Sequence, residues 1–306
     1  YDSAFFDKTA KFLKYLPDVA IVGNLEYDHA DIYPDMDALR LAFRRFVNLV
    51  PRRGLLLLGA DSPEAMALAA GARSTVETFG LADGATWQAH TIESTPQGMR
   101  FSVRRRGEPY GPIELPLFGT FNVRNALAAI AVADAEGVSQ SSIADALRAF
   151  KGVKRRLQLR GTEAGVSVYD DFAHHPTAIA ETLRGVRSAF PDRRIWAVFE
   201  PRSATSCRRI FQEDFAKAFA AEPVHRVILA AVFRANLPDA ERLSAERLVE
   251  DLRASGVRAD HIPAVDDIVA EIAREAGPGD IVVGMSNGGF DDFHNKLLAA
   301  LGQRAA

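Results

Sequence analysis

Uninterrupted apolar runs alternate with segments of helical periodicity in the first part of the chain. The runs at 18–24 and 54–58, rich in β-branched residues and leucine, predict buried parallel strands. Between them, 36–49 carries apolar residues on one helical face and predicts a helix. Ser62 before Pro63 is a helix start signal, so we expect a second helix there. This part therefore predicts alternating strands and helices.

The pattern changes from Thr75 onward, where short segments of alternating polarity are separated by turn signals. We expect these segments to be antiparallel strands that extend the parallel sheet; they lie at 86–92, 99–105 and 113–117. An alanine-rich segment at 123–135 predicts a helix that ends at Gly137, and Ser139 starts another that reaches Phe150. The basic stretch 151–156 then marks a junction, and we expect the domain boundary after residue 153.

The second half alternates more regularly and predicts a doubly wound sheet with right-handed crossovers. The expected strands are 166–169, 195–199, 226–230 and 280–283. The expected helices are 176–190, 208–220, 244–255, 265–276 and 290–301. The predicted fold class is therefore α/β, with a first domain at 1–153 and a second at 154–306.

Composition excludes several classes of protein. A net charge of -3 gives no general attraction to nucleic acid or to an anionic membrane. No apolar run approaches the roughly 18 residues of a membrane span. The single cysteine, Cys207, excludes a disulfide framework and suits a cytoplasmic location. Nothing in the sequence indicates an obligate protein partner.

Polar loops follow the expected strands of the second half. In doubly wound sheets, ligands bind beyond the carboxyl ends of the strands, so we expect the loops 170–174, 200–203, 231–234 and 284–289 to share one rim. In the first of them, Asp171 and His174 come just before a helix whose N-terminus favours anions. The alternative is that Asp171 caps that helix and that the histidines are surface residues.

A second polar cluster follows the first strand and contains Glu26, Asp28, His29 and Asp31. Carboxylates and an imidazole at this spacing are able to hold a divalent metal or to position one against phosphate oxygens. The alternative is a solvated loop in which Asp28 or Asp31 caps the next helix.

Two further groups of side chains are candidates. Arg155 and Arg156 lie at the junction, where small-molecule clefts are common, although a charge run is usually a solvated face. Asn122 and Asn125 are three residues apart and point the same way if both are helical, so they are able to read a base edge. The alternative gives Asn122 an N-cap role and leaves Asn125 simply exposed. Cys207 lacks a histidine motif and is expected to be an inert thiol.

Four ordered segments together resemble the Mur ligase family: 23–31, 119–129, 154–157 and 170–177. The resemblance covers essentially the whole chain. It implies a partial central ATP-binding domain, of ATPase type, over 1–153 and a Rossmann-like C-terminal domain over 154–306. The segments 1–8, 200–203 and 286–289 most resemble the members that join UDP-N-acetylmuramate to the murein tripeptide L-alanyl-γ-D-glutamyl-meso-diaminopimelate. Members that add L-alanine to UDP-N-acetylmuramate are the nearest alternative.

The resemblance implies an ATP-dependent amide ligase with Mg²⁺, acting in peptidoglycan recycling and thereby in cell-wall biogenesis, cell shape and cell division. It implies that the substrate carboxylate forms an acyl phosphate, which the incoming amine attacks. It also implies roles for individual residues: His29 near Mg²⁺, Asn125 and Asn122 at adenine, Arg156 at the nucleotide, and Asp171 and His174 at ribose or phosphates. Arg202, Ser286 and Asn287 are candidates for holding the carboxylates of the tripeptide.

The sequence also departs from the family pattern. It contains no Gly-x-x-x-x-Gly-Lys-[Ser/Thr] phosphate loop and no N-terminal UDP-binding domain, and Phe43-Arg44-Arg45 stands where some relatives carry a carbamylated lysine. The chain begins at Tyr1 without an initiator Met, so we expect a fragment of a longer protein. Because it lacks the phosphate loop, we expect this fragment not to turn over by itself. A non-catalytic nucleotide- or peptide-binding module and a metal-dependent hydrolase remain alternatives.

Overall fold

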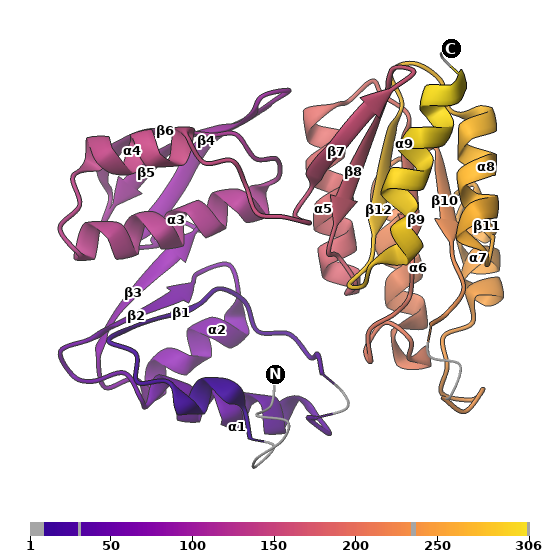
Figure 1. Ribbon diagram of the computed structural model, residues 1–306. Helices are drawn as coiled ribbons and strands as arrows, with labels where there is room; N and C mark the ends of the chain where they lie inside the picture. The colour runs from indigo at the N-terminus through magenta and orange to yellow at the C-terminus, as the bar shows by residue number, and fades with distance from the viewer. Residues whose placement is uncertain (1–8, 30–31, 234–236, 305–306) are drawn as a thin grey trace. The chain divides into compact units, whose positions relative to one another are not determined.

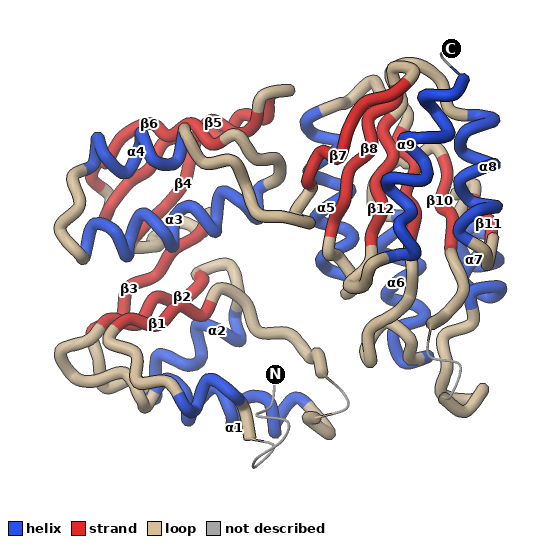
Figure 2. The backbone as a smooth tube through the Cα atoms, viewed as in Figure 1, coloured by secondary structure: helices blue, strands red, loops and turns tan. Residues whose placement is uncertain are grey.

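The computed structural model describes residues 9–29, 32–233 and 237–304. The chain divides into two compact units, residues 1–151 and 152–306. Each has its own six-stranded sheet with helices on both faces (Figures 1 and 2). The α/β fold class, with a mixed first sheet and a doubly wound second one, is confirmed.

The first unit is built on a sheet of strand order β1-β2-β3-β4-β5-β6. Strands β1 to β4 are parallel, and β5 and β6 continue the sheet antiparallel. The strands are β1 (Val19–Val22), β2 (Leu55–Gly59), β3 (Thr75–Gly80), β4 (Trp87–Thr95), β5 (Gly98–Arg105) and β6 (Glu108–Leu115). The helices are α1 (Met36–Val47), α2 (Pro63–Ala67), α3 (Thr120–Ala135) and α4 (Gln140–Arg148), with 3₁₀ turns η1 (Lys11–Lys14) and η2 (Leu68–Gly71).

The run of leucines in β2 explains why this sheet is covered on both faces. Successive strand side chains point to opposite faces. Leu56 and Leu58 pack in a core with Val47 of α1 and Ala65 of α2, whereas Leu57 packs in a separate core with Leu127 of α3. A continuous apolar run is therefore needed here, because a helix layer covers each face.

The second unit has the strand order β11-β10-β9-β12-β8-β7, with β8 to β12 parallel and β7 antiparallel at the edge. The strands are β7 (Gln158–Glu163), β8 (Val166–Asp171), β9 (Ile195–Phe199), β10 (Arg226–Leu229), β11 (Ala259–His261) and β12 (Ile281–Met285). The helices are α5 (Pro176–Ala189), α6 (Gln212–Ala220), α7 (Ala245–Ala254), α8 (Val265–Glu275) and α9 (Phe293–Arg304), with 3₁₀ turns η3 (Arg209–Phe211) and η4 (Phe290–Asp292).

Helices cover both faces of this second sheet (Figure 1). Helices α5, α6 and α7 pack side by side, and α8 packs against α9 on the opposite face. In sheets of this kind ligands bind beyond the carboxyl ends of the parallel strands, so the loops that follow the strands are where a site is expected. Among the described residues, no helix has the length and apolar character needed to cross a membrane.

Candidate functional site

Loops after neighbouring strands of the second unit are joined at the carboxyl edge of its sheet. The backbone N–H of Ser286 donates to the Asp171 carbonyl (3.1 Å), and the Ser286 hydroxyl donates to Glu200 Oε2 (2.5 Å). The loop after β10 joins them, because the Phe233 N–H donates to the Pro201 carbonyl (2.9 Å). The rim expected from the sequence therefore exists, although Arg234 lies outside the described residues.

Asp171 lies at the end of β8 with 3% of its surface exposed. Its carboxylate accepts hydrogen bonds from the N–H of Leu157 (2.7 Å), the N–H of Ala173 (2.8 Å) and the hydroxyl of Thr182 (3.2 Å). Burial raises the pKa of this carboxyl, opposed by these donors and by the nearby positive charge of Arg156. Asp171 thus ties the interdomain junction to the start of the β8–α5 loop.

Asp171 does not cap helix α5, so that alternative is wrong. His175 occupies the N-cap position and makes no side-chain capping bond, and Pro176 follows it in the first turn. The ring nitrogen Nδ1 of His174 lies 2.9 Å from the Phe172 carbonyl, and the His175 ring makes an edge contact with Phe211. Both histidines therefore pack against neighbouring residues of this unit.

The junction itself has an unusual backbone. Arg155 and Leu157 have φ of 61° and 46°, a left-handed conformation that is rare outside glycine. The guanidinium groups of Arg155 and Arg156 lie 5.0 and 5.3 Å from the centre of the Phe172 ring. Within the described part of the chain, Arg156 has no carboxylate partner, and it is exposed. Its charge is consequently available for an anionic ligand.

Arg202 lies on the loop after β9 and makes two kinds of contact. Its guanidinium stacks 3.7 Å from the centre of the Phe233 ring and lies 3.5 Å from Glu200. The same side chain packs over Gly288, where a Cβ would overlap its Cδ and Nε atoms. The sequence predicted Arg202, Ser286 and Asn287 as one group of candidates, and the structure places them on the loops of this rim.

His29, in the first unit, follows β1 in the left-handed region with φ of 55°. The Asp28 carboxylate accepts from the His29 N–H (2.7 Å) and lies 3.8 Å from the imidazole. Asp31 lies outside the described residues, and among those described no three His, Cys, Asp or Glu side chains form a metal-binding group. The alternative, in which Asp28 or Asp31 caps the next helix, is wrong, since Asp35 caps α1 through the Ala38 N–H.

Asn122 and Asn125 lie in the first turns of α3, but the N-cap position belongs to Gly119, so the N-cap alternative for Asn122 is wrong. Asn122, 8% exposed, donates from its side-chain amide to the Phe118 carbonyl (2.8 Å). Its amide oxygen accepts at 3.4 Å from the side chain of Asn125, which is exposed. Asn122 therefore orients Asn125, and only Asn125 presents its amide to solvent.

Asp61 and Arg124 form a link that sequence reasoning missed. The Asp61 carboxylate accepts from the N–H groups of Leu81 (3.0 Å) and Ala82 (2.8 Å) and pairs with Arg124 Nε (2.7 Å). Arg124 precedes Asn125 on α3, so Asp61 fixes the helix that carries the two asparagines. A local signal existed, because Asp61 directly follows a buried strand, but its partners are distant in sequence.

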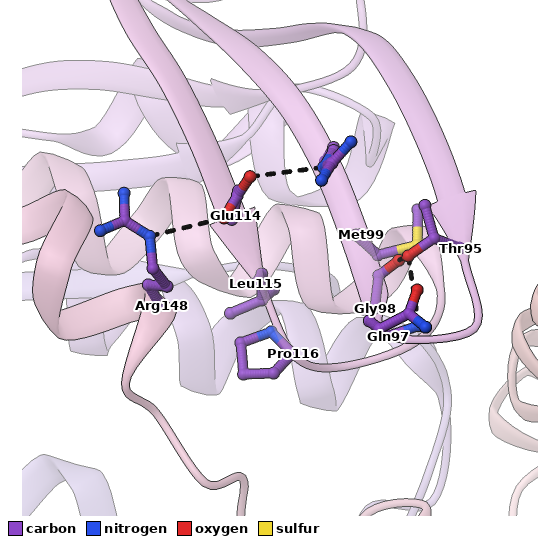
Figure 3. A pocket seen from close by; sticks show the side chains of 9 residues that line it. Thr95, Gln97, Gly98, Met99, Glu114, Leu115, Pro116 and Arg148 are labelled. Atoms are coloured by element: carbon purple, nitrogen blue, oxygen red, sulfur yellow. Dashed lines mark hydrogen bonds and ion pairs between the residues drawn. The ribbon is translucent and has the colours of Figure 1, made fainter.

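A cavity of about 390 Å³ opens between the β4–β5 turn, the end of β6 and α4 (Figure 3). Glu114 stands between Arg100 and Arg148, with their Nε atoms 3.3 and 3.4 Å from its two oxygens. The Glu114 carboxylate thus forms ion pairs with both guanidinium groups. None of the candidates from the sequence lines this cavity.

Comparison with known proteins identifies what these units are similar to. The family models for the Mur ligase middle domain and the Mur ligase glutamate ligase domain match residues 5–133 and 155–288. UDP-N-acetylmuramate–L-alanyl-γ-D-glutamyl-meso-2,6-diaminoheptandioate ligase of Escherichia coli is 38% identical over 100% of this chain and 64% of its own length.

Two other relatives are similarly close. UDP-N-acetylmuramate–L-alanine ligase of Phenylobacterium zucineum is 39% identical over 95% of this chain and 61% of its own length. The crystal structure of a murein peptide ligase from Psychrobacter arcticus has a TM-score of 0.68 and 35% identity, over 99% of this chain and 61% of that one. The chain thus spans less than two thirds of the length of these relatives.

Proposed function

Because the chain belongs to the Mur ligase family, as its middle and C-terminal domains, we propose that the protein is an ATP-dependent amide ligase of cytoplasmic peptidoglycan recycling. The proposed substrates are UDP-N-acetylmuramate and the tripeptide L-alanyl-γ-D-glutamyl-meso-diaminopimelate. This choice is favoured by the share of the chain that is matched, since the E. coli tripeptide ligase matches 100% of it and the P. zucineum L-alanine ligase matches 95%. The second candidate, an L-alanine ligase, is favoured by the 39% identity of the P. zucineum enzyme.

The side chains available in each unit support nucleotide binding. Exposed Arg156, which has no carboxylate partner within the described residues, suits a phosphate group, and its position is fixed by Phe172 and by the Asp171 bond to Leu157. Asn125 suits a base edge, since its amide offers one donor and one acceptor and Asn122 orients it. We propose these contacts with ATP, and His174 as a further contact from the β8–α5 loop.

Asp171 fits a different role from the ribose or phosphate contact expected at first. Both its oxygens already accept hydrogen bonds from the protein. We propose that it holds the left-handed turn that presents Arg156, and that it acts on the nucleotide through that arginine. ATP supplies the γ-phosphate that activates the substrate carboxylate. The residues of this chain contribute by positioning reactants and by neutralising negative charge.

Among the described residues, no three His, Cys, Asp or Glu side chains lie together as a metal-binding group, and Mg²⁺ at a nucleotide needs only one or two side chains together with the phosphates. His29 is the proposed contact near the metal. For the tripeptide, Arg202, Ser286 and Asn287 are the proposed contacts, because a guanidinium and a loop of backbone donors suit carboxylates. Their place on one rim of the second unit supports this assignment.

The experiment is an ADP-release and product assay of the complete gene product with UDP-N-acetylmuramate, offering either the tripeptide or L-alanine. We expect the tripeptide to be preferred by kcat/KM. A preference for L-alanine would establish the second candidate instead, and no amide formation with either amine would overturn both. The 306-residue chain alone is expected to be inactive, because it contains no phosphate-loop motif.

A further inference from the structure

Arg155 makes contacts that the proposed function does not use. Its Nη2 atom donates to two carbonyls of the loop after β12, those of Ser286 (2.5 Å) and Gly288 (2.6 Å). Its Nε atom lies 3.5 Å from Asp170 Oδ1, and its guanidinium stacks on Phe172. One side chain from the junction thus joins the ends of β8 and β12.

In the loop 286–289, which Arg155 holds in this way, three carbonyl groups accept hydrogen bonds but two N–H groups do not donate any to the described residues. The carbonyl groups of Ser286 and Gly288 accept from Arg155, and that of Gly289 accepts from the Asp292 N–H (3.2 Å). The Gly288 N–H donates to the Ser286 hydroxyl (2.9 Å). Within the described residues, the N–H groups of Asn287 and Gly289 have no acceptor. These two backbone donors are therefore left for a ligand.

Buried charge behind the loop fixes the direction of Arg155. Asp170 is 3% exposed, and its other oxygen pairs with Arg160 Nη1 (3.0 Å). His294 Nε2 lies 3.7 Å from Asp170 Oδ1, at a point where a Cβ on Gly284 would overlap the imidazole. Because a buried carboxylate is costly without cationic partners, Asp170 holds both guanidinium groups in place.

We propose that Arg155 is a positioning residue that holds the carbonyls of Ser286 and Gly288 toward itself and so presents the N–H groups of Asn287 and Gly289 to a carboxylate of the amine substrate. This inference rests on the proposed function and adds to it the residue that prepares the substrate loop. Arg155→Lys keeps the charge but lacks the planar guanidinium, whose Nη2 bonds both carbonyls while its Nε lies near Asp170 and its plane lies over the Phe172 ring.

The chain offers a matched control for this role. Arg160 pairs with the same Asp170 as Arg155 does, but the structure of the described residues shows no bond from it to the loop 286–289. We therefore compare Arg155→Met, Arg155→Lys and Arg160→Met in the complete gene product. The two measurements are steady-state kinetics and hydrogen exchange of peptides that cover residues 284–290, with a peptide from α5 as the folding control.

We expect Arg155→Met to raise the KM for the tripeptide about tenfold, a loss of about 1.4 kcal/mol, while the KM for ATP and for UDP-N-acetylmuramate stays within about twofold. Arg155→Lys should lie between this variant and the wild type, and Arg160→Met should leave the tripeptide KM within about twofold. Exchange over 284–290 should accelerate in Arg155→Met but not in Arg160→Met. A tripeptide amidated at its carboxyl groups should show the same KM with wild type and Arg155→Met.

Equal effects of Arg155→Met and Arg160→Met would overturn the proposal, because they would show that only the pairing of Asp170 matters. An unchanged exchange rate over 284–290 in Arg155→Met would overturn it as well. If the wild-type protein made no amide with any amine, the proposed function would fail. The exchange measurement would still decide whether Arg155 orders the loop.

Discussion

The carboxylate of Asp171 accepts a hydrogen bond of 2.7 Å from the backbone N–H of Leu157, 14 residues earlier in the chain. This bond connects the end of β8 to the left-handed turn that carries Arg156. Removing the Asp171 carboxylate should therefore loosen the turn that presents Arg156 to the nucleotide.

Asp171→Ala should impair both folding stability and turnover. The substitution leaves the N–H groups of Leu157 and Ala173 without their acceptor in a buried place, which costs about 1–3 kcal/mol. Urea unfolding measures this loss, and the ligation assay measures turnover at a temperature where the variant is folded. Asp192→Ala, on an exposed turn, is the control and should change stability by less than about 0.5 kcal/mol. Wild-type stability in Asp171→Ala would contradict the structural role.

Asp61→Ala should destabilise the first unit. The variant leaves the N–H groups of Leu81 and Ala82 and the guanidinium of Arg124 without their shared acceptor, at a cost of about 1–3 kcal/mol. Although partial burial opposes ionisation, the bonds from Leu81, Arg124 and Ala82 hold the pKa of Asp61 below its usual value. Asp83→Ala is the control, since Asp83 is exposed and, among the described residues, accepts a hydrogen bond from the Gln88 side chain alone. The two variants should differ in urea midpoint, and equal midpoints would argue against the link.

Much of the fold follows from apolar periodicity, and the strands that were missed show its limits. β3 contains Glu77, whose carboxylate accepts from the Trp87 indole N–H (2.8 Å) and from Arg106 (2.8 Å). A charged residue in a buried strand is acceptable only because these later residues satisfy it. β7 is a polar edge strand and β11 has 3 residues, so neither carries an apolar run.

The sequence predicts which loops form the candidate site, but it does not predict where their side chains point. The polar loops after β8, β9 and β12 are visible in the sequence, and the rule on carboxyl ends places them together. The direction in which each side chain points was not visible. Asp170 and Asp171 are adjacent, yet one pairs with Arg155 and Arg160 and the other with backbone N–H groups. Such partners are set by tertiary packing, which local sequence does not encode.

Asn122→Ala and Asn125→Ala should have different effects, the first on the stability of the fold and the second on the binding of ATP. Asn122→Ala removes a buried bond to the Phe118 carbonyl and should lower the free energy of unfolding by about 1 kcal/mol. Asn125→Ala removes an exposed side chain and should leave stability within about 0.5 kcal/mol while weakening ATP binding. Calorimetry with ATP and urea unfolding, both on the complete gene product, make the comparison. If Asn125→Ala bound ATP as the wild type does, its proposed contact with the base would be wrong.

Gly288→Ala should disturb the substrate loop through Arg202. A Cβ at position 288 would overlap the Arg202 side chain and force it away from the Phe233 ring. We expect a rise of about tenfold in the KM for the tripeptide with a smaller change in the KM for ATP. Gly71→Ala, in the first unit, is the control, because a Cβ there meets nothing within 4 Å. Equal KM values in the two variants would remove Arg202 from the proposed tripeptide contacts.

Glu275→Gln should make the free energy of unfolding fall less steeply as the pH is lowered into the acid range. Glu275, 21% exposed, accepts two hydrogen bonds from Arg258 (2.5 and 2.8 Å) and lies 3.2 Å from His225 Nε2. The Arg258 bonds lower the pKa of Glu275 from 4.5 to about 2, against the opposing effect of burial and with support from His225.

An acid whose pKa falls on folding stabilises the folded state above its unfolded pKa, and this contribution disappears as the pH falls through the folded value. The wild type should therefore lose stability between pH 4.5 and about 2, and Glu275→Gln should lose about 1 kcal/mol less over that range, since solvent screens the pair. Urea unfolding from pH 2.5 to 6 measures both curves. Glu250→Gln, an exposed substitution on α7, should run parallel to the wild type. If Glu275→Gln also ran parallel, the Arg258 pair would contribute nothing to acid stability.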